Sequence, residues 1–387
     1  MTEARAPDAA ARTNPWWLWG LVQGVCLALA FYRGFRAPSL WSLNYYQLSW
    51  ADGFLRRGLL GTLLLPLGCA RFDPHVIWMI QCAVLAAASA VLFSLGRRGT
   101  AVALALCVFW ASRLGTQFFN EVGYPDQVLI LLAVACGALL SRGRVWATAL
   151  VLAAAALIHE MAAFTVLPLV LALRSRLPLG KRPALWKLLT PPALALAALP
   201  YFATSVPVAT LLRYSGHALA CGHPLGRPDF LSYYRDSLGQ ALHCYYLGPE
   251  WFGMLLPLAA SLALWILLGG AFPGALMGER CAALLACLCP LLLGFLGADR
   301  NRWLLLALLQ VVLLLGLSPS ASPSDPGPAP SRPGAWRRAT LALPLLIFVL
   351  TLRFALFDGF EARPLDLDAI RGFGADLAGQ WDRPPLR

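Results

Sequence analysis

The chain has 387 residues, of which 59% are hydrophobic and only 13% are charged, and its formal net charge is +12. Ordinary soluble domains carry roughly 25% charged residues, so this composition excludes a soluble globular domain and favours a polytopic membrane protein. It also argues against a nucleic-acid partner, because the arginines are scattered between apolar segments and form no basic domain.

Nearly uncharged segments recur along the chain, and many approach the roughly 20 residues that a helix needs to cross a bilayer. We therefore predict an all-α fold, a polytopic integral membrane helical bundle with about eleven transmembrane helices. The predicted spans are residues 16–32, 75–95, 100–116, 127–140, 145–159, 161–173, 187–204, 251–272, 281–297, 303–317 and 340–357.

The N-terminal tail, residues 1–15, lacks the basic, apolar and cleavage regions of a signal peptide, so we expect a retained first helix and a cytoplasmic N-terminus. With this orientation, short connections rich in Arg and Lys fall inside, as the positive-inside rule expects. These inner connections are 96–99, 141–144, 174–187 and 278–280. The bias towards Ala, Leu, Arg and Pro suggests a GC-rich bacterial genome, and hence a multi-pass protein of the bacterial plasma (inner) membrane.

The rest of the chain follows from this orientation. A membrane-embedded domain covers residues 16–317, and a Pro/Ser-rich segment, 318–338, is predicted as a disordered cytoplasmic linker. The last transmembrane helix is 339–357, and the tail 358–387 falls outside. The predicted outer loops are 33–74, 117–127, 205–250 and 298–302.

Within the first outer loop, the apolar stretch 59–68 is too short to span the membrane, so we interpret it as re-entrant or interfacial. Of the 19 acidic residues, only Glu3, Asp8, Glu279 and Asp325 fall inside. The positive-inside rule does not require this asymmetry of acids, so we expect the polar chemistry on the outer face.

The first motif on that face is SWADGFLRRGLLG, residues 49–61, with Asp52 four residues before Arg56. In a helix this spacing would place the two side chains on one face as an ion pair. Arg56 and Arg57 can simply anchor the loop in lipid headgroups. They can also bind phosphate through planar, bidentate donors, with Asp52 as a carboxylate that activates an acceptor.

The second motif, FFNEVGYPDQ at 118–127, places Asn120, Glu121, Tyr124 and Asp126 in the next outer loop. A plain connecting loop is one interpretation. Two acids in so short a loop between apolar helices also suit the second half of a catalytic pair.

The third motif, LIHEMAAF at 157–164, has His159 and Glu160 where one apolar run meets the next. It is not the zinc-protease signature HExxH, because Ala163 stands where the second histidine would be. A tight polar turn would explain the pair, but ionisable groups at membrane depth are candidates for function, here as a base or hydrogen-bonding element.

The fourth motif, GADRNRW at 297–303, returns Asp299, Arg300 and Arg302 to the outer face. An interfacial salt bridge with Trp303 as anchor would explain this composition. Phosphate or sugar binding is the functional alternative.

The longest outer loop, 205–250, contains Cys221 and Cys244. We predict a disulfide between them, as expected in an oxidising compartment. A zinc site with the neighbouring histidines is less well supported, because no short-spaced CxxC pair is present.

The motif around Asp52, the acidic loop Asn120–Asp126 and GADRNRW together resemble the C-type membrane glycosyltransferases and the related polysaccharide polymerases of bacterial envelopes. Those many-helix, N-inside enzymes have an acid in the first outer loop and use polyprenyl-phosphate-linked sugars. The resemblance implies a lipid-linked sugar donor, a glycan or lipid acceptor, and membrane lipids around the helices. Many of those enzymes have two close acids in that loop and a soluble C-terminal domain. Here Asp52 stands alone and the outer tail is short, which leaves the identity of the base open.

The resemblance also implies roles. Arginines would stabilise the charge on the departing lipid phosphate, and a carboxylate, Asp52 first and Glu121 or Glu160 second, would take the proton of the acceptor hydroxyl. The candidate catalytic residues are Asp52, Glu121, Asp126, His159 and Glu160. The candidate phosphate- or substrate-binding residues are Arg56, Arg57, Asn120, Tyr124, Asp299, Arg300 and Arg302. No residue is assigned as a metal ligand, and a divalent cation, Mg²⁺ or Mn²⁺, is the only candidate cofactor.

Three other classes remain open. A transporter or flippase for a lipid-linked or anionic substrate would carry charges on broken helices at mid-membrane, whereas these charges gather at one surface. An outer-leaflet acyl or phospho-group transferase would use His159 and Glu160 as its base, and should tolerate changes at Arg56. A non-enzymatic assembly protein is the last alternative.

Overall fold

The computed structural model describes residues 16–54, 56–198, 205–223, 277–293, 300–318 and 360–382, together with positions 350 and 356. Every regular element in these ranges is helical, which confirms the all-α prediction. The predicted span 251–272 and the tail 1–15 lie outside the described residues. So do the linker 318–338 and the last span, apart from positions 318, 350 and 356.

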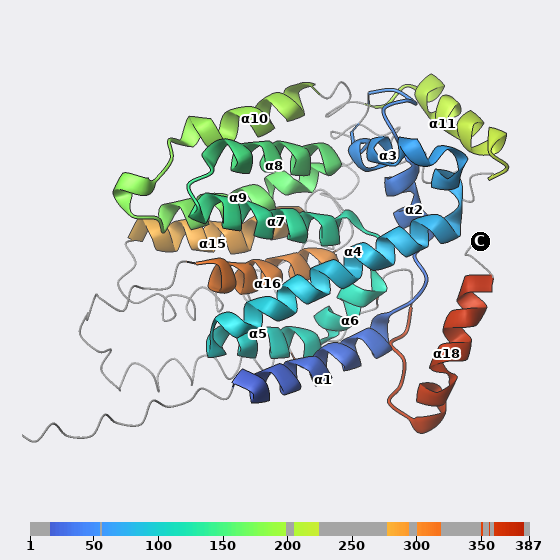
Figure 1. The fold of residues 1–387 in the computed structure, drawn as a ribbon, viewed down its shortest axis with the longest axis horizontal. Coiled ribbons are helices and arrows are strands. Elements are labelled where there is room, and N and C mark those ends of the chain that lie inside the picture. The colour runs from blue at the N-terminus through green and yellow to red at the C-terminus, as the bar shows by residue number, and fades with distance from the viewer. Residues whose placement is uncertain are drawn as a thin grey trace, which may run out of the picture.

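The helices of the main bundle pack side by side (Figure 1), and most begin close to the start of a predicted span. They are α1 Trp16–Gly34, α4 Pro74–Leu95, α5 Thr100–Ala111, α6 Arg113–Asn120, α7 Pro125–Ser141, α8 Val145–Ile158, α9 Val166–Ser175, α10 Leu185–Ala198, α15 Met277–Leu292 and α16 Arg300–Leu317. The core lies between α4, α5, α7, α9 and α16, where side chains such as Leu92, Leu106, Leu169 and Val312 are fully buried.

Length and composition identify one segment of the described chain, Pro74–Arg98, as a helix that can cross a membrane by itself. The pair α5 and α6 becomes a second candidate if it forms one bent span, and α7, α8 and Asn301–Leu317 are apolar but shorter. The number of about eleven spans therefore stays a prediction.

Two of the predicted spans are interrupted. Between α5 and α6 the helix axis turns by 71°, and Ser112 accepts a hydrogen bond from the Leu114 amide at 3.2 Å to begin the new helix. Span 100–116 is therefore not one straight helix. Likewise, span 161–173 begins with the short 3₁₀ helix η3, Glu160–Ala163, before α9 starts at Val166.

The apolar stretch 59–68 forms two short pieces, α3 Leu59–Leu63 and the 3₁₀ helix η1 Leu65–Phe72. Five helical residues extend only about 7.5 Å, so α3 cannot cross a bilayer. Its backbone lies against the end of α2, Leu40–Gln47, where a Cβ at Gly61 would come within 1.9 Å of the Leu48 carbonyl oxygen. Only glycine permits this approach.

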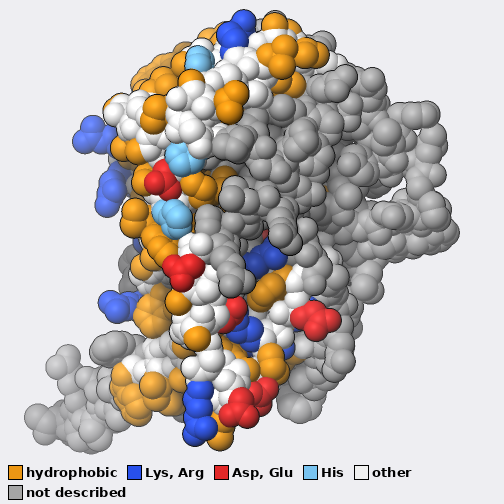
Figure 2. All heavy atoms as spheres, turned by 90° about the vertical axis from the view of Figure 1, so that its right-hand side faces the viewer, with side chains coloured by type: hydrophobic (Ala, Val, Ile, Leu, Met, Phe, Trp, Pro, Cys, Tyr) orange, Lys and Arg blue, Asp and Glu red, His pale blue; other side chains and the backbone are white. Residues whose placement is uncertain are grey.

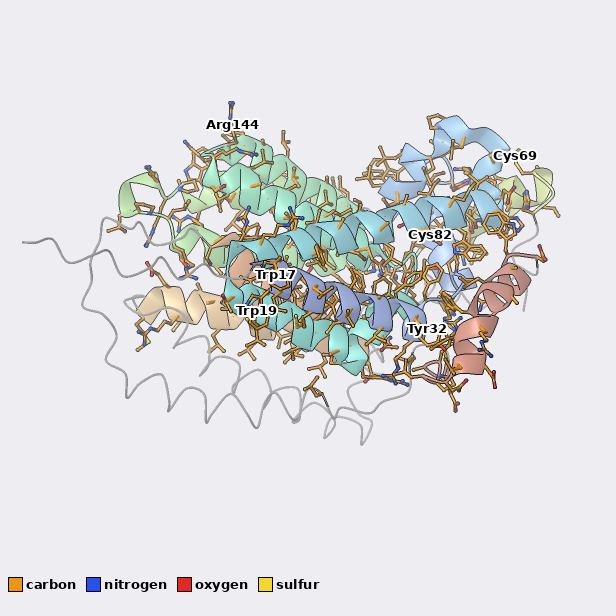
Figure 3. The ribbon with its side chains drawn as sticks, turned by 60° about the horizontal axis from the view of Figure 1, so that its bottom comes forward. Trp17, Trp19, Tyr32, Cys69, Cys82 and Arg144 are labelled. Atoms are coloured by element: carbon orange, nitrogen blue, oxygen red, sulfur yellow. A yellow bond between two sulfur atoms is a disulfide. The ribbon has the colours of Figure 1, made fainter. Side chains whose placement is uncertain are left out.

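The two ends of the bundle differ. The short helices α2 and α3, with α11 Val208–Ala220 and α18 Leu367–Asp382, gather at the end on the right in Figure 1. We call this the polar end. The basic connections between α4 and α5, α7 and α8, and α9 and α10 lie at the opposite end; in Figure 3, Arg144 marks that end and Cys69 the polar end. The segments predicted outside and inside are thus separated in space.

A disulfide crosses the polar end, and its pairing corrects the predicted Cys221–Cys244 bond. Cys221, at the end of α11, is bonded to Cys69 in η1, with a Cα–Cα distance of 5.3 Å. The physical reason is that the stretch after α3 folds over α2 and brings Cys69 beside α11, a tertiary approach that sequence spacing does not indicate. Cys244 lies outside the described residues.

Candidate active site

At the polar end, two ion pairs, one buried and one partly buried, meet around a tyrosine. The first joins Arg57, just before α3, to Glu160 in η3. The Nε of Arg57 lies 2.9 Å from Oε1 and 3.0 Å from Oε2 of Glu160, and the Nη2 of Arg57 also contacts Oε1. The Arg57 backbone has φ of 64°, a left-handed conformation that costs a non-glycine residue of order 1–3 kcal/mol. Such strain is frequent at functional sites.

The second pair joins Arg302, in the first turn of α16, to Asp126, in the first turn of α7. The Nε of Arg302 lies 2.6 Å from Oδ2 of Asp126, and its Nη2 lies 2.9 Å from Oδ1, so the contact is bidentate. Both side chains are buried, at 4% and 2% exposure. The guanidinium carbon also lies 4.5 Å from the ring centre of Tyr124.

Tyr45, on α2, connects these pairs. Its ring centre lies 5.8 Å from that of Tyr124 and 5.7 Å from that of His159, and the Arg57 guanidinium carbon lies 5.8 Å from it. We call Tyr45, Arg57, Tyr124, Asp126, His159, Glu160 and Arg302 the arginine–carboxylate cluster. Arg57, Asp126 and Glu160, which belong to three separate motifs, thus lie in one cluster with Arg302.

His159 is the member of the cluster with unused hydrogen-bonding capacity. Its Nδ1 accepts a hydrogen bond from the Met161 amide at 3.2 Å, so in the neutral ring the proton is on Nε2. That Nε2 is buried and has no hydrogen-bond partner in the part of the chain that the structure describes. A buried donor without a partner is costly, so this N–H is available to a water molecule or a ligand.

The acidic loop is a buried turn rather than an exposed connection. Glu121 accepts a hydrogen bond from Gln117 at 2.6 Å, and its charge acts on Arg302. Asn120 is buried too, and neither polar atom of its side chain has a partner among the described residues. Gly123, at φ of 82°, allows the turn to pass Gln81, which a Cβ would meet at 2.2 Å.

Asp52 lies apart from these ion pairs. Its Oδ2 accepts hydrogen bonds from the Ser49 amide at 3.1 Å and the Ser49 hydroxyl at 2.8 Å, and its Oδ1 lies 2.6 Å from Nδ1 of His217 on α11. The predicted Asp52–Arg56 ion pair is therefore wrong, because the segment forms a turn instead of a helix. Arg56 is buried, and its charge acts on His159 and Glu160.

Sequence reasoning missed Tyr45, His217 and Arg71 as site residues. Arg71 donates to the Ser49 hydroxyl at 2.7 Å and so supports the Asp52 contacts. The only available signal was their location in the predicted outer loops. Asp299 and the side chain of Arg300 lie outside the described residues. Figure 2 shows the polar end, where acidic, basic and histidine side chains lie among apolar ones.

Among the described residues, other groups already hold the carboxylates of the site, and the Mg²⁺ or Mn²⁺ stays a prediction. Arginines hold the carboxylates of Asp126 and Glu160, and Ser49 and His217 hold that of Asp52. Within the described ranges, no three His, Cys, Asp or Glu side chains are grouped as a metal site requires. The cations that this site presents are its arginines.

No protein-family model, curated protein or solved structure matches this chain. The resemblance to the C-type glycosyltransferases therefore rests on the short motifs alone and stays a prediction.

Proposed function

We propose that this chain is a membrane glycosyltransferase or polysaccharide polymerase. It transfers a sugar from a polyprenyl-phosphate-linked donor to an envelope glycan or lipid acceptor on the outer face of the bacterial plasma membrane. About eleven helices cross the membrane, with the N-terminus in the cytoplasm and the polar end outside. The basic connections at the opposite end support this orientation, as does the disulfide at the polar end, because disulfides persist in oxidising compartments.

The observation that carries the proposal is the buried Nε2–H of His159 beside the two arginine pairs. A phosphate oxygen is a strong acceptor for such a donor, and arginines bind phosphate in a planar, bidentate geometry. An arginine has five N–H donors, so it can contact a carboxylate and a phosphate at once. The carboxylates of Glu160 and Asp126 hold the guanidinium groups in place before substrate arrives.

The chemistry follows from this placement. When the bond between the anomeric carbon and the lipid phosphate breaks, negative charge develops on the leaving phosphate. Arg57, Arg302 and the His159 N–H stabilise that charge in a water-poor site, where preorganised donors have their largest effect. Tyr45 and Tyr124 contact the two guanidinium groups as cation–π partners, and the lipid chain lies between Leu-rich helices.

The test uses the full chain in proteoliposomes with a panel of radiolabelled polyprenyl-phosphate hexoses and pentoses, and envelope glycan as acceptor. Arg57→Lys and Arg302→Lys retain the charge but lose the planar fork, so each should lower the transfer rate by about 10² or more. Arg98→Lys is the matched control, because Arg98 donates to the Gly316 carbonyl oxygen at the opposite end.

Wild-type rates in both lysine variants would contradict the proposal. Movement of the lipid-linked sugar across the bilayer without a new glycosidic bond would favour the alternative, a transporter or flippase.

A further inference from the structure

Asp52 and His217 form a hydrogen-bonded pair in which only the histidine reaches the surface. The Asp52 side chain is 0% exposed, whereas the His217 side chain is 49% exposed. An ionised carboxylate only accepts hydrogen bonds, so the 2.6 Å contact is a donation from Nδ1–H of His217 to Oδ1 of Asp52. In the neutral ring, Nε2 then carries the lone pair.

This geometry changes the role that the sequence motif gave to Asp52. Its Oδ2 already accepts from the Ser49 amide and hydroxyl, and its Oδ1 accepts from His217. A fully buried carboxylate with these contacts cannot reach the hydroxyl group of an acceptor. The half-exposed imidazole of His217 can, and a carboxylate at Nδ1 both fixes its tautomer and stabilises its protonated form.

We propose that His217 is the general base that deprotonates the acceptor, and that Asp52 is its positioning residue. This inference rests on the proposed function. The acceptor hydroxyl gives its proton to Nε2 while its oxygen bonds to the anomeric carbon. The bond from that carbon to the phosphate oxygen breaks, and its electron pair leaves with the lipid phosphate. The proton then passes from His217 to solvent.

α11 packs against α2, the helix that also carries a member of the arginine–carboxylate cluster. Tyr214, one turn before His217 on the same face of α11, contacts Asn44 Oδ1 at 2.7 Å and Gln47 Oε1 at 3.1 Å through its hydroxyl. These two residues belong to α2, whose Tyr45 is a member of the cluster. α2 thus connects α11, which carries His217, to the cluster.

Other contacts fix the pair in place. Arg213 donates to the Asp52 carbonyl oxygen at 2.9 Å, and Arg71 donates to the Ser49 hydroxyl. These are the charged groups that reach the pair from α11 and η1, and both are cations. The Cys69–Cys221 bond ties the last turn of α11, four residues beyond His217, to η1.

The first test does not depend on knowing the substrate. The purified full chain is treated with diethyl pyrocarbonate, which reacts with the imidazole lone pair, and the rate at each histidine is followed by mass spectrometry. In Asp52→Asn, the amide can donate to Nδ1 and move the proton to Nε2. The rate at His217 should then fall about tenfold or more, while the rate at His223 stays constant. An unchanged rate at His217 would overturn the inference.

The second test uses the transfer assay above. His217→Gln and Asp52→Asn should each lower kcat by about 10² or more, with KM for the donor unchanged, and the double variant should be no slower than His217→Gln. Free imidazole should restore part of the rate to His217→Ala. His223→Gln is the matched control, and formation of the Cys69–Cys221 bond reports correct folding in every variant.

The outcomes distinguish the two proposals. A wild-type rate in His217→Gln, with slow Arg57→Lys and Arg302→Lys variants, overturns the base and leaves the glycosyltransferase. Wild-type rates in the two lysine variants contradict the transferase and, with it, the role of His217. Loss of rate in both sets supports both proposals.

Discussion

Arg57 and Arg302 find their carboxylate partners 103 and 176 residues away along the chain. Buried ion pairs of this kind are weak evidence for stability, because desolvation offsets most of the Coulomb attraction. Breaking one is nevertheless costly, since the remaining charge stays in a water-poor place. We interpret the two pairs as a device that holds guanidinium groups in position for a phosphate.

At this scale we predict that Asp126→Asn lowers the free energy of unfolding by about 3–5 kcal/mol, because it leaves the buried Arg302 guanidinium without its carboxylate. Equilibrium unfolding in mixed micelles measures the change. Glu279→Gln is the matched control, since the Arg182–Glu279 pair is more exposed and should contribute about 1 kcal/mol or less. Equal effects of the two substitutions would show that the burial of the cluster has no energetic role.

The C-terminal helix α18 is attached to the bundle through polar contacts and a few aromatic rings. Arg363 donates to Asp376 Oδ2 at 3.0 Å and to the carbonyl oxygens of Tyr32 and Phe35, and Phe373 packs on the Phe31 ring. Trp381 lies against His75 and Trp78. Because one carboxylate joins the helix to Arg363, the attachment should depend on pH.

Burial raises the pKa of Asp376, but hydrogen bonds from Arg363 and Gln380, together with the Arg363 charge, outweigh it and hold the pKa below its ordinary value of 3.8. A lowered folded-state pKa means that the stabilisation is complete above about pH 4 and is lost as the pH falls through the folded pKa. We therefore expect α18 to detach in strong acid.

Hydrogen–deuterium exchange of Leu367–Asp382, corrected for the intrinsic effect of pH, checks this. Asp376→Asn should give fast exchange already at pH 6. Asp368→Asn, at a carboxylate that is 98% exposed, should behave as wild type. Slow exchange in Asp376→Asn would show that the aromatic contacts suffice.

At the scale of the whole molecule, one covalent bond connects two segments that are 152 residues apart. Closing a long loop reduces the conformational freedom of the unfolded chain, and such bonds typically contribute about 2–4 kcal/mol. Cys69→Ser should therefore lower the free energy of unfolding by that amount and speed exchange in α11. Cys281→Ser, at an exposed free thiol, is the control. If α11 exchanges equally slowly in both variants, its noncovalent contacts alone hold it.

Much of this architecture could be predicted from the sequence, because its signals are local: apolar runs mark the helices, prolines mark where some of them begin, and basic residues mark the connections at one end. The end of the molecule where Arg57, Asp126 and Glu160 lie was also predictable, since each followed from the expected orientation. Their pairing was not, because it depends on how the turn before α3 packs against η3 and how the first turn of α7 packs against that of α16. The buried state of Asp52 was missed for the same reason: its partner His217 is 165 residues away.

The left-handed backbone of Arg57 has an evolutionary consequence. Glycine would relieve the strain at this position, but alone it would leave the Glu160 carboxylate without its guanidinium partner. A sequence optimised for stability alone would therefore be expected to replace both residues, with an uncharged side chain at position 160, and so to lose the guanidinium. At this arginine the protein gives up some stability in exchange for activity. Searches for stabilised variants of this chain should therefore hold position 57 fixed.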